Sequence, residues 1–379
     1  MKQAIINTVK ENEWQKSLDI IHTAGNIIRN GGTVIFPTET VYGLGANALD
    51  PRAAQRIYKA KGRPTDNPLI VHISDEAMLE DIASDISDEA RLLIKAYWPG
   101  PLTLIFYKKD IVPSATTGGL ETVAVRMPSN RIAQKLIEEA GVPVAAPSAN
   151  ISGKPSITSG KYAVEEMASR VDMIILSENS QIGIESTVVD MTTHLPIVLR
   201  PGKISQSQIL RTIAKDERDY AAKMAELEEL IHSRSSNQAV PRSPGMKYRH
   251  YSPNAELILM SREKLIPLTK DFLQETAKGY IIEEKQKKEW QKLFGKSTDI
   301  SPNQVKVLTT DDALVHYKGL GVSLGQNGEE IGKNLFKTLR DLDEQGVLLI
   351  FCEDFEELEQ NEFLTAVMNR IRKAANNVE

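Results

Sequence analysis

Short apolar runs of strand type alternate with helical stretches along this chain, and the alternation breaks once, between about residues 212 and 250. Before the break, the runs TVIFP, LIVHIS, PLTLIFYK and TVAVRMP each fit a buried strand, and stretches with helical spacing lie between them. Strands and helices that intermix in this way favour one α/β domain around a large, partly parallel sheet. We therefore expect residues 1–211 to form one domain, in which TETVYGLGAN is a glycine-containing turn region.

The break has the composition of a linker. A charged helical stretch, AAKMAELEELIHS, runs into the Ser-, Pro- and Asn-rich segment SRSSNQAVPRSPG, which indicates a linker over residues 212–253. The linker ends in PGMKYRHYSP, whose aromatic and basic residues a plain tether does not need. Over residues 254–379, the strand-like runs AELILM, YIIEE, VKVLTT and VLLIFCED alternate with helical segments. This second pattern predicts a smaller, parallel, Rossmann-like α/β domain in three layers.

Composition and charge exclude several classes of protein. Apolar residues make up 41% and charged residues 26% of the chain, which is ordinary for a globular protein. The net charge of −5 argues against a surface covered with basic residues, although a local basic cleft stays compatible with it. The one cysteine, Cys352, cannot form an internal disulfide and fits a reducing compartment. Because no signal-type segment and no apolar run of about 20 residues occurs, we expect a cytoplasmic protein without a membrane partner.

Several common motifs are excluded by their spacing. The run SGKPS lacks the P-loop glycine five residues before its Gly-Lys pair, because Ser148 stands there. The glycines of GLGVSLG do not match the dinucleotide fingerprint, so a turn is the better interpretation. The six histidines are scattered without the spacing of a zinc site, and no G-x-S-x-G elbow supports a hydrolase triad.

Cations and small polar groups gather where probable strands begin or end. Lys61 and Arg63 follow an expected helix over 51–61 and lead into LIVHIS, beside Asn67 and His72. Taken alone, a Lys-Gly-Arg triplet is usually a solvated helix end, and His72 fits a core histidine as well as a ligand-binding one. Strand alternation places Leu69, Val71 and Ile73 on one face and Ile70, His72 and Ser74 on the other.

A second group of polar residues follows other expected strands. Ser148 and Asn150 lie in the loop after PVAAP, where they fit either a turn or hydrogen bonds to phosphate oxygens. Arg126 and Arg200 end the runs TVAVR and PIVLR, and a buried arginine there would need a carboxylate or phosphate partner. Together these residues have the composition of a pocket for a polyphosphate and a carboxylate.

An ordered set of motifs resembles a known family. FPTETVYGLGAN, KGRPxxNPLIVH, WPGPLT, TVAVRMP, APSAN, ESTVVD and LRPG occur here in the order typical of the YrdC-type threonylcarbamoyl-AMP synthases. The match covers about residues 15–205, and PGMKYRHYSP with the following segment is similar to the long, two-domain members. The resemblance implies a YrdC-like twisted mixed sheet with helices in the catalytic domain, followed by the smaller Rossmann-like domain.

The resemblance also implies a reaction, in which L-threonine, bicarbonate and ATP become L-threonylcarbamoyladenylate and pyrophosphate for the threonylcarbamoyladenosine modification of tRNA. The family's catalytic signature corresponds to Lys61, Arg63, Ser148 and Asn150. Implied threonine contacts are Thr38, His72, Arg126, the backbone of Ala146, and Ser186. Implied ATP contacts are Arg63, Asn67, Thr122, Ser148, Ser156, Arg200 and Tyr248.

The implied chemistry sets further expectations. Mg²⁺ is expected on the ATP triphosphate, with protein ligands that the sequence does not identify. An adenylate that is labile in water needs a cover, and PGMKYRHYSP with Tyr248 is the candidate lid. tRNA and tRNA-modification proteins are further candidate partners.

Two alternatives stay open at this point. Some relatives with this fold are associated with double-stranded RNA, so the chain is alternatively an RNA-binding module that forms no adenylate. The other alternative is the carbamoyl-adenylate chemistry of hydrogenase maturation, but this chain lacks the cysteines of those larger proteins.

Overall fold

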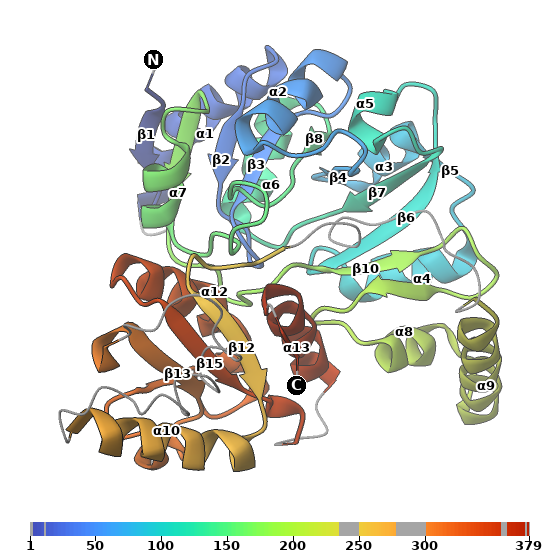
Figure 1. Ribbon diagram of the computed structural model, residues 1–379. Coiled ribbons are helices and arrows are strands. Elements are labelled where there is room, and N and C mark those ends of the chain that lie inside the picture. Colours follow the sequence, from blue (N-terminus) through green and yellow to red (C-terminus); the bar gives the residue numbers. More distant parts are fainter. Residues whose placement is uncertain are drawn as a thin grey trace. The chain divides into compact units, whose positions relative to one another are not determined.

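The computed structural model describes residues 3–10, 13–234, 250–277, 301–357, 362–375 and 377–378. Its internal contacts divide the chain into two compact units (Figure 1). The first unit is Met1–Ser152 with Ser156–Tyr248, and the second is Gly153–Pro155 with Arg249–Glu379. Within the described residues, no helix combines the length and the apolar character that a membrane crossing requires.

A mixed sheet forms the centre of the first unit, as the sequence predicts. Its strand order is β1-β9-β2-β3-β8-β4-β7-β6-β10-β11, and β5 pairs with β6. The strands are β1 Ile5–Thr8, β2 Val34–Phe36, β3 Gly43–Asn47, β4 Ile70–His72, β5 Ala83–Ser84, β6 Leu102–Lys108, β7 Thr122–Arg126, β8 Val144–Ala145, β9 Met173–Leu176, β10 Thr187–Asp190 and β11 Ile197–Arg200. The helices are α1 Trp14–Arg29, α2 Pro51–Lys61, α3 Glu76–Ile82, α4 Asp88–Tyr97, α5 Ser114–Thr117, α6 Arg131–Ala140, α7 Gly160–Met167, α8 Gln206–Ile213 and α9 Glu217–Arg234.

The expectation of a turn over TETVYGLGAN is wrong for its second half, which forms β3. This strand pairs antiparallel with β2 and with β8. Two glycines hide it from sequence patterning, because Gly usually weakens a strand. Here a Cβ on Gly45 would lie 2.7 Å from the Phe36 ring and 2.8 Å from Val144, so the close approach of neighbouring strands requires glycine.

The alternation predicted around β4 is confirmed. Leu69, Val71 and Ile73 pack in the main core of the unit. Ile70 faces the other way and joins a smaller apolar cluster with Ala124 of β7. Strand β4 is parallel to β7, so His72 and Arg126 are register partners at the ends of these two strands. The face that holds the smaller cluster therefore also holds a histidine and an arginine.

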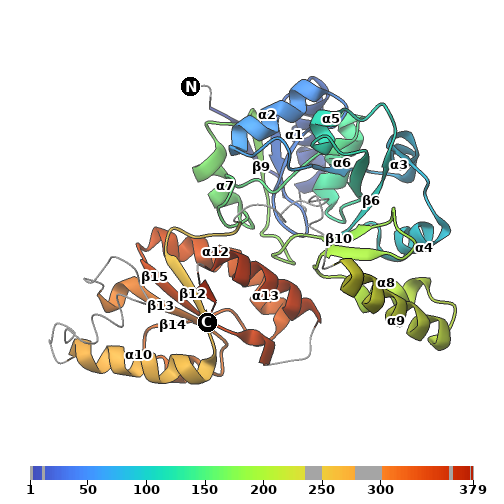
Figure 2. The ribbon, with the colours of Figure 1, turned by 45° about the vertical axis from the view of Figure 1, so that its right-hand side comes forward.

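Helices α8 and α9 belong to the first unit, although the sequence predicts a linker from residue 212. They contact each other and lie side by side in both ribbon views (Figure 2). Leu227 of α9 is buried in the main core, and Tyr220 and Met224 pack against that core. The Ser- and Pro-rich residues 235–249 that follow, with Tyr248, lie outside the described residues.

The second unit has an all-parallel sheet, which fits the predicted Rossmann-like pattern. Its strand order is β14-β13-β15-β12-β16. The strands are β12 Glu256–Met260, β13 Val305–Thr309, β14 Gly321–Ser323, β15 Leu349–Glu353 and β16 Asn377–Val378, and the helices are α10 Arg262–Ala277, α12 Gly328–Glu344 and α13 Glu362–Ala374. The predicted strand YIIEE lies outside the described residues. The mixed α/β fold class of the chain, with its second domain, is confirmed.

Three residues of the SGKPS run are held within the second unit. The Gly153 carbonyl accepts a hydrogen bond from the Ser252 N–H at 2.8 Å. The Pro155 carbonyl accepts from Nε of the buried Arg340, on α12, at 3.1 Å, and from its Nη2. These bonds hold the Gly153 and Pro155 carbonyls within the second unit, and the next residue of the chain, Ser156, belongs to the first.

Candidate active site

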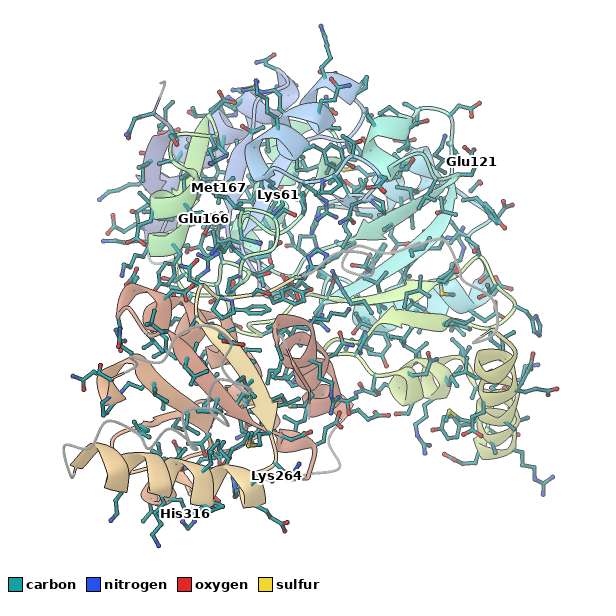
Figure 3. The ribbon with its side chains drawn as sticks, viewed as in Figure 1. Lys61, Glu121, Glu166, Met167, Lys264 and His316 are labelled. Atoms are coloured by element: carbon teal, nitrogen blue, oxygen red, sulfur yellow. The ribbon has the colours of Figure 1, made fainter. Side chains whose placement is uncertain are left out.

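Lys61 is brought together with the other residues of the predicted signature. It is the last residue of α2, which ends because Gly62 adopts the left-handed conformation at φ 61°. The side chain, labelled in Figure 3, is only 1% exposed. Its Nζ donates to the Ser148 carbonyl at 2.5 Å and to the Asn150 carbonyl. A buried ammonium thus joins the end of α2 to the loop after β8.

Arg63 turns back onto its own loop. Its Nε donates to the Asn67 carbonyl at 3.3 Å and its Nη2 to the Pro68 carbonyl at 3.1 Å. The Asn67 carbonyl also accepts from the Tyr58 hydroxyl at 3.1 Å. These bonds shape the segment between α2 and β4, so Arg63 and Asn67 are both buried on the same turn.

Arg126 leads a buried hydrogen-bond chain into the turn between β2 and β3. Its Nε donates to the Gly100 carbonyl at 3.1 Å, and its Nη1 donates to the Thr40 hydroxyl at 2.9 Å. The Thr40 and Thr38 hydroxyl oxygens lie 2.9 Å apart, and Thr38 donates to the Val41 carbonyl at 2.6 Å. Because Thr38 gives its proton to a carbonyl, its hydroxyl oxygen is the acceptor toward the Thr40 hydroxyl.

Glu39 forms a buried ion pair with Arg126. Its Oε1 accepts from Arg126 Nη2 at 2.5 Å and from the Ser129 N–H at 3.1 Å. Burial raises the pKa of the Glu39 carboxyl, but the charge and hydrogen bond of Arg126 and the Ser129 N–H outweigh it. The net effect lowers the pKa below its usual value, so Glu39 is ionised and its charge balances that of Arg126.

His72 is neutral at physiological pH. Burial and, to a lesser degree, the nearby Arg126 charge lower its pKa to about 3, against the smaller opposing effect of the Glu39 charge. The imidazole lies edge-on to Phe36, with ring centroids 6.5 Å apart, and is 4% exposed. The His72 ring can therefore form hydrogen bonds beside the Arg126–Glu39 pair without adding a charge of its own.

Replacing His72 with Gln is expected to reduce the loss of stability in mild acid. The folded chain binds this proton with a pKa of about 3, whereas the ordinary value is 6.5, so between these pH values the unfolded chain binds more protons. The stabilisation is complete above about pH 6.5 and falls by about 1 kcal/mol per pH unit below it. Urea-unfolding free energies between about pH 7 and pH 5 measure the slope. Equal slopes in wild type and His72→Gln would contradict the assignment.

Arg200 holds Ser186 in place, and its register partner Val188 belongs to the same small apolar cluster as Ile70 and Ala124. At the end of β11, its Nε and Nη2 donate to the Ser186 carbonyl at 3.1 and 3.0 Å, and Nη2 reaches the Ser186 hydroxyl at 3.1 Å. The same hydroxyl lies 2.8 Å from that of Thr103. One arginine therefore fixes both the backbone and the side chain of Ser186, the residue that precedes β10.

The remaining predicted residues are placed as follows. The Ser156 hydroxyl donates to Glu185 Oε1 at 2.5 Å, and both side chains are buried. The Ala146 N–H donates to the Ile70 carbonyl at 2.8 Å. Thr122 begins β7 and is half-buried. The structure thus places Lys61 at the end of α2 and the other described site residues on strands or in loops of the same unit, and Tyr248 stays a prediction.

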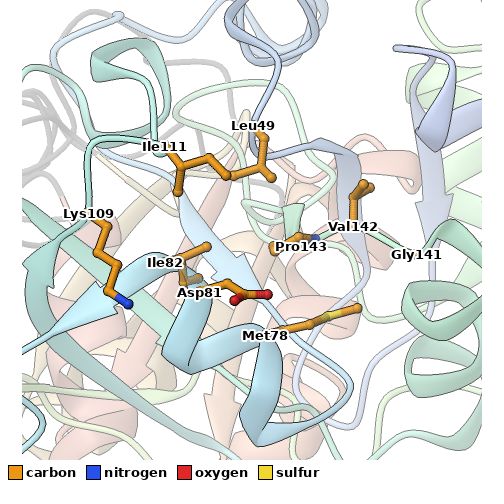
Figure 4. Close-up of a pocket in the computed structure, with 9 residues that line it drawn as sticks. All are labelled: Leu49, Met78, Asp81, Ile82, Lys109, Ile111, Gly141, Val142 and Pro143. Atoms are coloured by element: carbon orange, nitrogen blue, oxygen red, sulfur yellow. The ribbon is translucent and has the colours of Figure 1, made fainter.

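A cavity of about 430 Å³ lies elsewhere in the first unit (Figure 4). Its lining is mostly apolar and consists of Leu49, Met78, Asp81, Ile82, Lys109, Ile111, Gly141, Val142 and Pro143. None of the predicted site residues lines it, so this cavity is separate from the candidate active site.

Both parts of the chain match family models. Residues 26–202 match the Sua5, YciO and YrdC family, described as "Telomere recombination". Residues 209–376 match the family described as "Threonylcarbamoyl-AMP synthase, C-terminal domain". A relative from Pyrococcus abyssi (strain GE5 / Orsay), named threonylcarbamoyl-AMP synthase, is 42% identical and covers 98% of this chain and 97% of the relative. The chain belongs to the threonylcarbamoyl-AMP synthase family.

Other members of the threonylcarbamoyl-AMP synthase family support the match over the full chain. A Bacillus subtilis (strain 168) member is 38% identical and covers 94% of this chain and 92% of its own length. The crystal structure of P. abyssi Sua5 complexed with L-threonine is 40% identical, with a TM-score of 0.75 and 98% of each chain covered. A shorter relative from Mycobacterium tuberculosis (strain ATCC 25618 / H37Rv) is 36% identical and covers 53% of this chain and 92% of itself.

Four residues at the site were missed by sequence reasoning: Glu39, Thr40, Thr103 and Glu185. Glu39 and Thr40 stand in the motif FPTETVYGLGAN, but they meet Arg126 across 87 and 86 residues. Glu185 similarly lies 29 residues from Ser156, in the motif ESTVVD. The signal available in the sequence was an acidic residue inside each of these two family-like motifs. If such a residue is buried, its charge needs a partner.

Proposed function

We propose that this chain synthesises L-threonylcarbamoyladenylate from L-threonine, bicarbonate and ATP, releases pyrophosphate, and supplies tRNA threonylcarbamoylation in the cytoplasm. One observation carries the proposal: the first unit buries four cations, Lys61, Arg63, Arg126 and Arg200. The chain as a whole matches this synthase family in sequence and in fold. Buried cations of this kind suit a reaction that brings several anions together.

The residues divide between the two larger substrates. For threonine, we propose contacts from Thr38, His72, Arg126, the backbone of Ala146, and Ser186. For ATP, we propose contacts from Arg63, Asn67, Thr122, Ser148, Ser156, Arg200 and Tyr248. Lys61 and Asn150 complete the catalytic signature, with Lys61 toward a phosphate or the intermediate. The ordered motifs and the placement of the described residues in one unit support this division.

Charge and position account for the chemistry. The threonine amine attacks the bicarbonate carbon as a neutral amine, and loss of water gives a carbamate. A carbamate oxygen then attacks the α-phosphorus of ATP, and the bond to the pyrophosphate oxygen breaks. Both reactants are anionic, so Lys61, Arg63 and Arg200 would lower the barrier by stabilising the phosphate charges. Their hydrogen bonds to fixed carbonyls keep them in place without substrate, which favours positioning as the main catalytic effect.

Mg²⁺ is the proposed companion of ATP. Among the described residues, no group of three His, Cys, Asp or Glu side chains stands close enough to hold a metal. Mg²⁺ with ATP is usually bound by phosphates, water and one or two carboxylates, and the Glu185 carboxylate beside Ser156 is the candidate protein ligand. The ion would supply charge neutralisation on the triphosphate.

Pyrophosphate release tests the proposal against an RNA-binding module. We expect release from ATP only when threonine and bicarbonate are both present, and little effect of added double-stranded RNA. Tight RNA binding by a chain that releases no pyrophosphate under these conditions would overturn the enzyme assignment.

A further inference from the structure

One oxygen of the Glu39 carboxylate is buried without a donor. Oε1 has two donors, whereas Oε2 has no hydrogen-bond partner among the described residues. The side chain is 8% exposed and ionised. Leaving a charged acceptor unsatisfied costs more than a typical hydrogen bond provides, so native structures rarely do it without a function.

Arg126, the ion-pair partner of Glu39, also has N–H groups that these contacts do not use. A guanidinium has five N–H groups, and Arg126 uses three of them, toward Gly100, Thr40 and Glu39. One N–H on each of Nη1 and Nη2 is left over from these contacts. The pair therefore presents a cation with open donors directly beside a carboxylate with an open acceptor.

This arrangement is complementary to a zwitterion. An α-amino acid bears an ammonium and a carboxylate on one carbon, so its binding partners must be a neighbouring anion and cation. Arg126 and Glu39 are in direct contact at 2.5 Å, and the neighbouring His72 is neutral. A lone Arg126 would bind any small carboxylate, whereas the pair favours one that also has an ammonium.

We propose that Glu39 Oε2 binds the α-ammonium of threonine while Arg126 binds its carboxylate, in the complex that forms before the amine loses its proton and attacks bicarbonate. The inference rests on the proposed function and adds to it a residue that sets substrate specificity. It explains how a site with Arg126 selects an amino acid over simple hydroxy acids, because removing the amine leaves the Glu39 charge buried and unpaired.

Calorimetric binding to the full-length chain tests this role with a matched pair of ligands, L-threonine and (R)-3-hydroxybutyrate, which is threonine without its amine. Wild type should bind threonine at least about tenfold more tightly than 3-hydroxybutyrate. Glu39→Gln keeps an acceptor for Arg126 but removes the charge. It should weaken threonine binding by roughly ten- to a hundredfold and leave 3-hydroxybutyrate binding unchanged.

Other outcomes separate this inference from competing ones. If Glu39 only orients Arg126, Glu39→Gln weakens both ligands equally, and this result overturns the inference. Equal binding of both ligands by wild type overturns it without any variant, which covers the case that Glu39→Gln does not fold. Glu178→Gln, which changes an exposed carboxylate of the same unit, should bind both ligands as wild type does. Failure of wild type to bind threonine at all would instead count against the proposed function.

Discussion

Replacing Lys61 or Arg63 with alanine is expected to lower the rate of adenylate formation at least about a hundredfold, while the chain stays folded. The expected size follows from the loss of one fixed charge-stabilising donor at a developing phosphate charge. Lys61 is also a structural residue, because its Nζ holds the Ser148 and Asn150 carbonyls. Initial rates of pyrophosphate release, with circular dichroism as the measure of folding, give the result.

Two further variants separate charge from packing. Lys61→Met keeps most of the side-chain volume and should lose as much activity as Lys61→Ala, because the ammonium is what acts. Lys59→Ala removes an exposed lysine from the same helix and should retain full activity. Near-normal turnover in both Lys61→Ala and Arg63→Ala would show that the catalytic residues lie elsewhere.

Cutting the chain near residue 215 is expected to remove most of the activity. The cut deletes the predicted lid PGMKYRHYSP and the second unit, including Arg340, whose Nε donates to the carbonyl before Ser156. The chain would thus lose the predicted cover and the arginine that holds the Pro155 carbonyl. Because this cut also removes α9, whose Leu227 is buried in the first unit, a fragment ending at residue 234 is the better-matched comparison.

The two fragments give a clear contrast. We expect both to lose most pyrophosphate release, and the longer one to be the more stable because it retains α9. Full activity in the fragment ending at 234 would show that PGMKYRHYSP is only a tether and that the second unit is dispensable. Both outcomes are worth testing, because the shorter relative from M. tuberculosis aligns with only 53% of this chain.

Elements that follow from local patterns were predictable from the sequence. The apolar alternation of LIVHI predicted both the strand β4 and the face on which His72 lies, because side-chain direction in a strand repeats every two residues. The helix α2 was expected from its spacing, and its end at Gly62 places Lys61. The ordered motifs, which are specific only together, indicated the family that the full-length relatives then showed.

Features that depend on distant partners were not predictable in the same way. Strand β3 was missed because Gly45 is required by Phe36 and Val144 of neighbouring strands, not by its own sequence neighbours. The sequence predicts that a buried Arg126 needs an anionic partner, but it does not identify Glu39, which lies 87 residues away. This pairing makes the proposed threonine site an ion pair rather than a lone cation, and an ion pair is complementary to a zwitterion.

The central claim is that this chain joins threonine, bicarbonate and ATP into one adenylate. Mass spectrometry of a reaction with ¹³C-labelled bicarbonate tests it most directly. The account predicts a threonylcarbamoyladenylate that bears one labelled carbon, formed in step with pyrophosphate and absent when threonine is left out. Pyrophosphate release without a labelled, threonine-containing adenylate would contradict it.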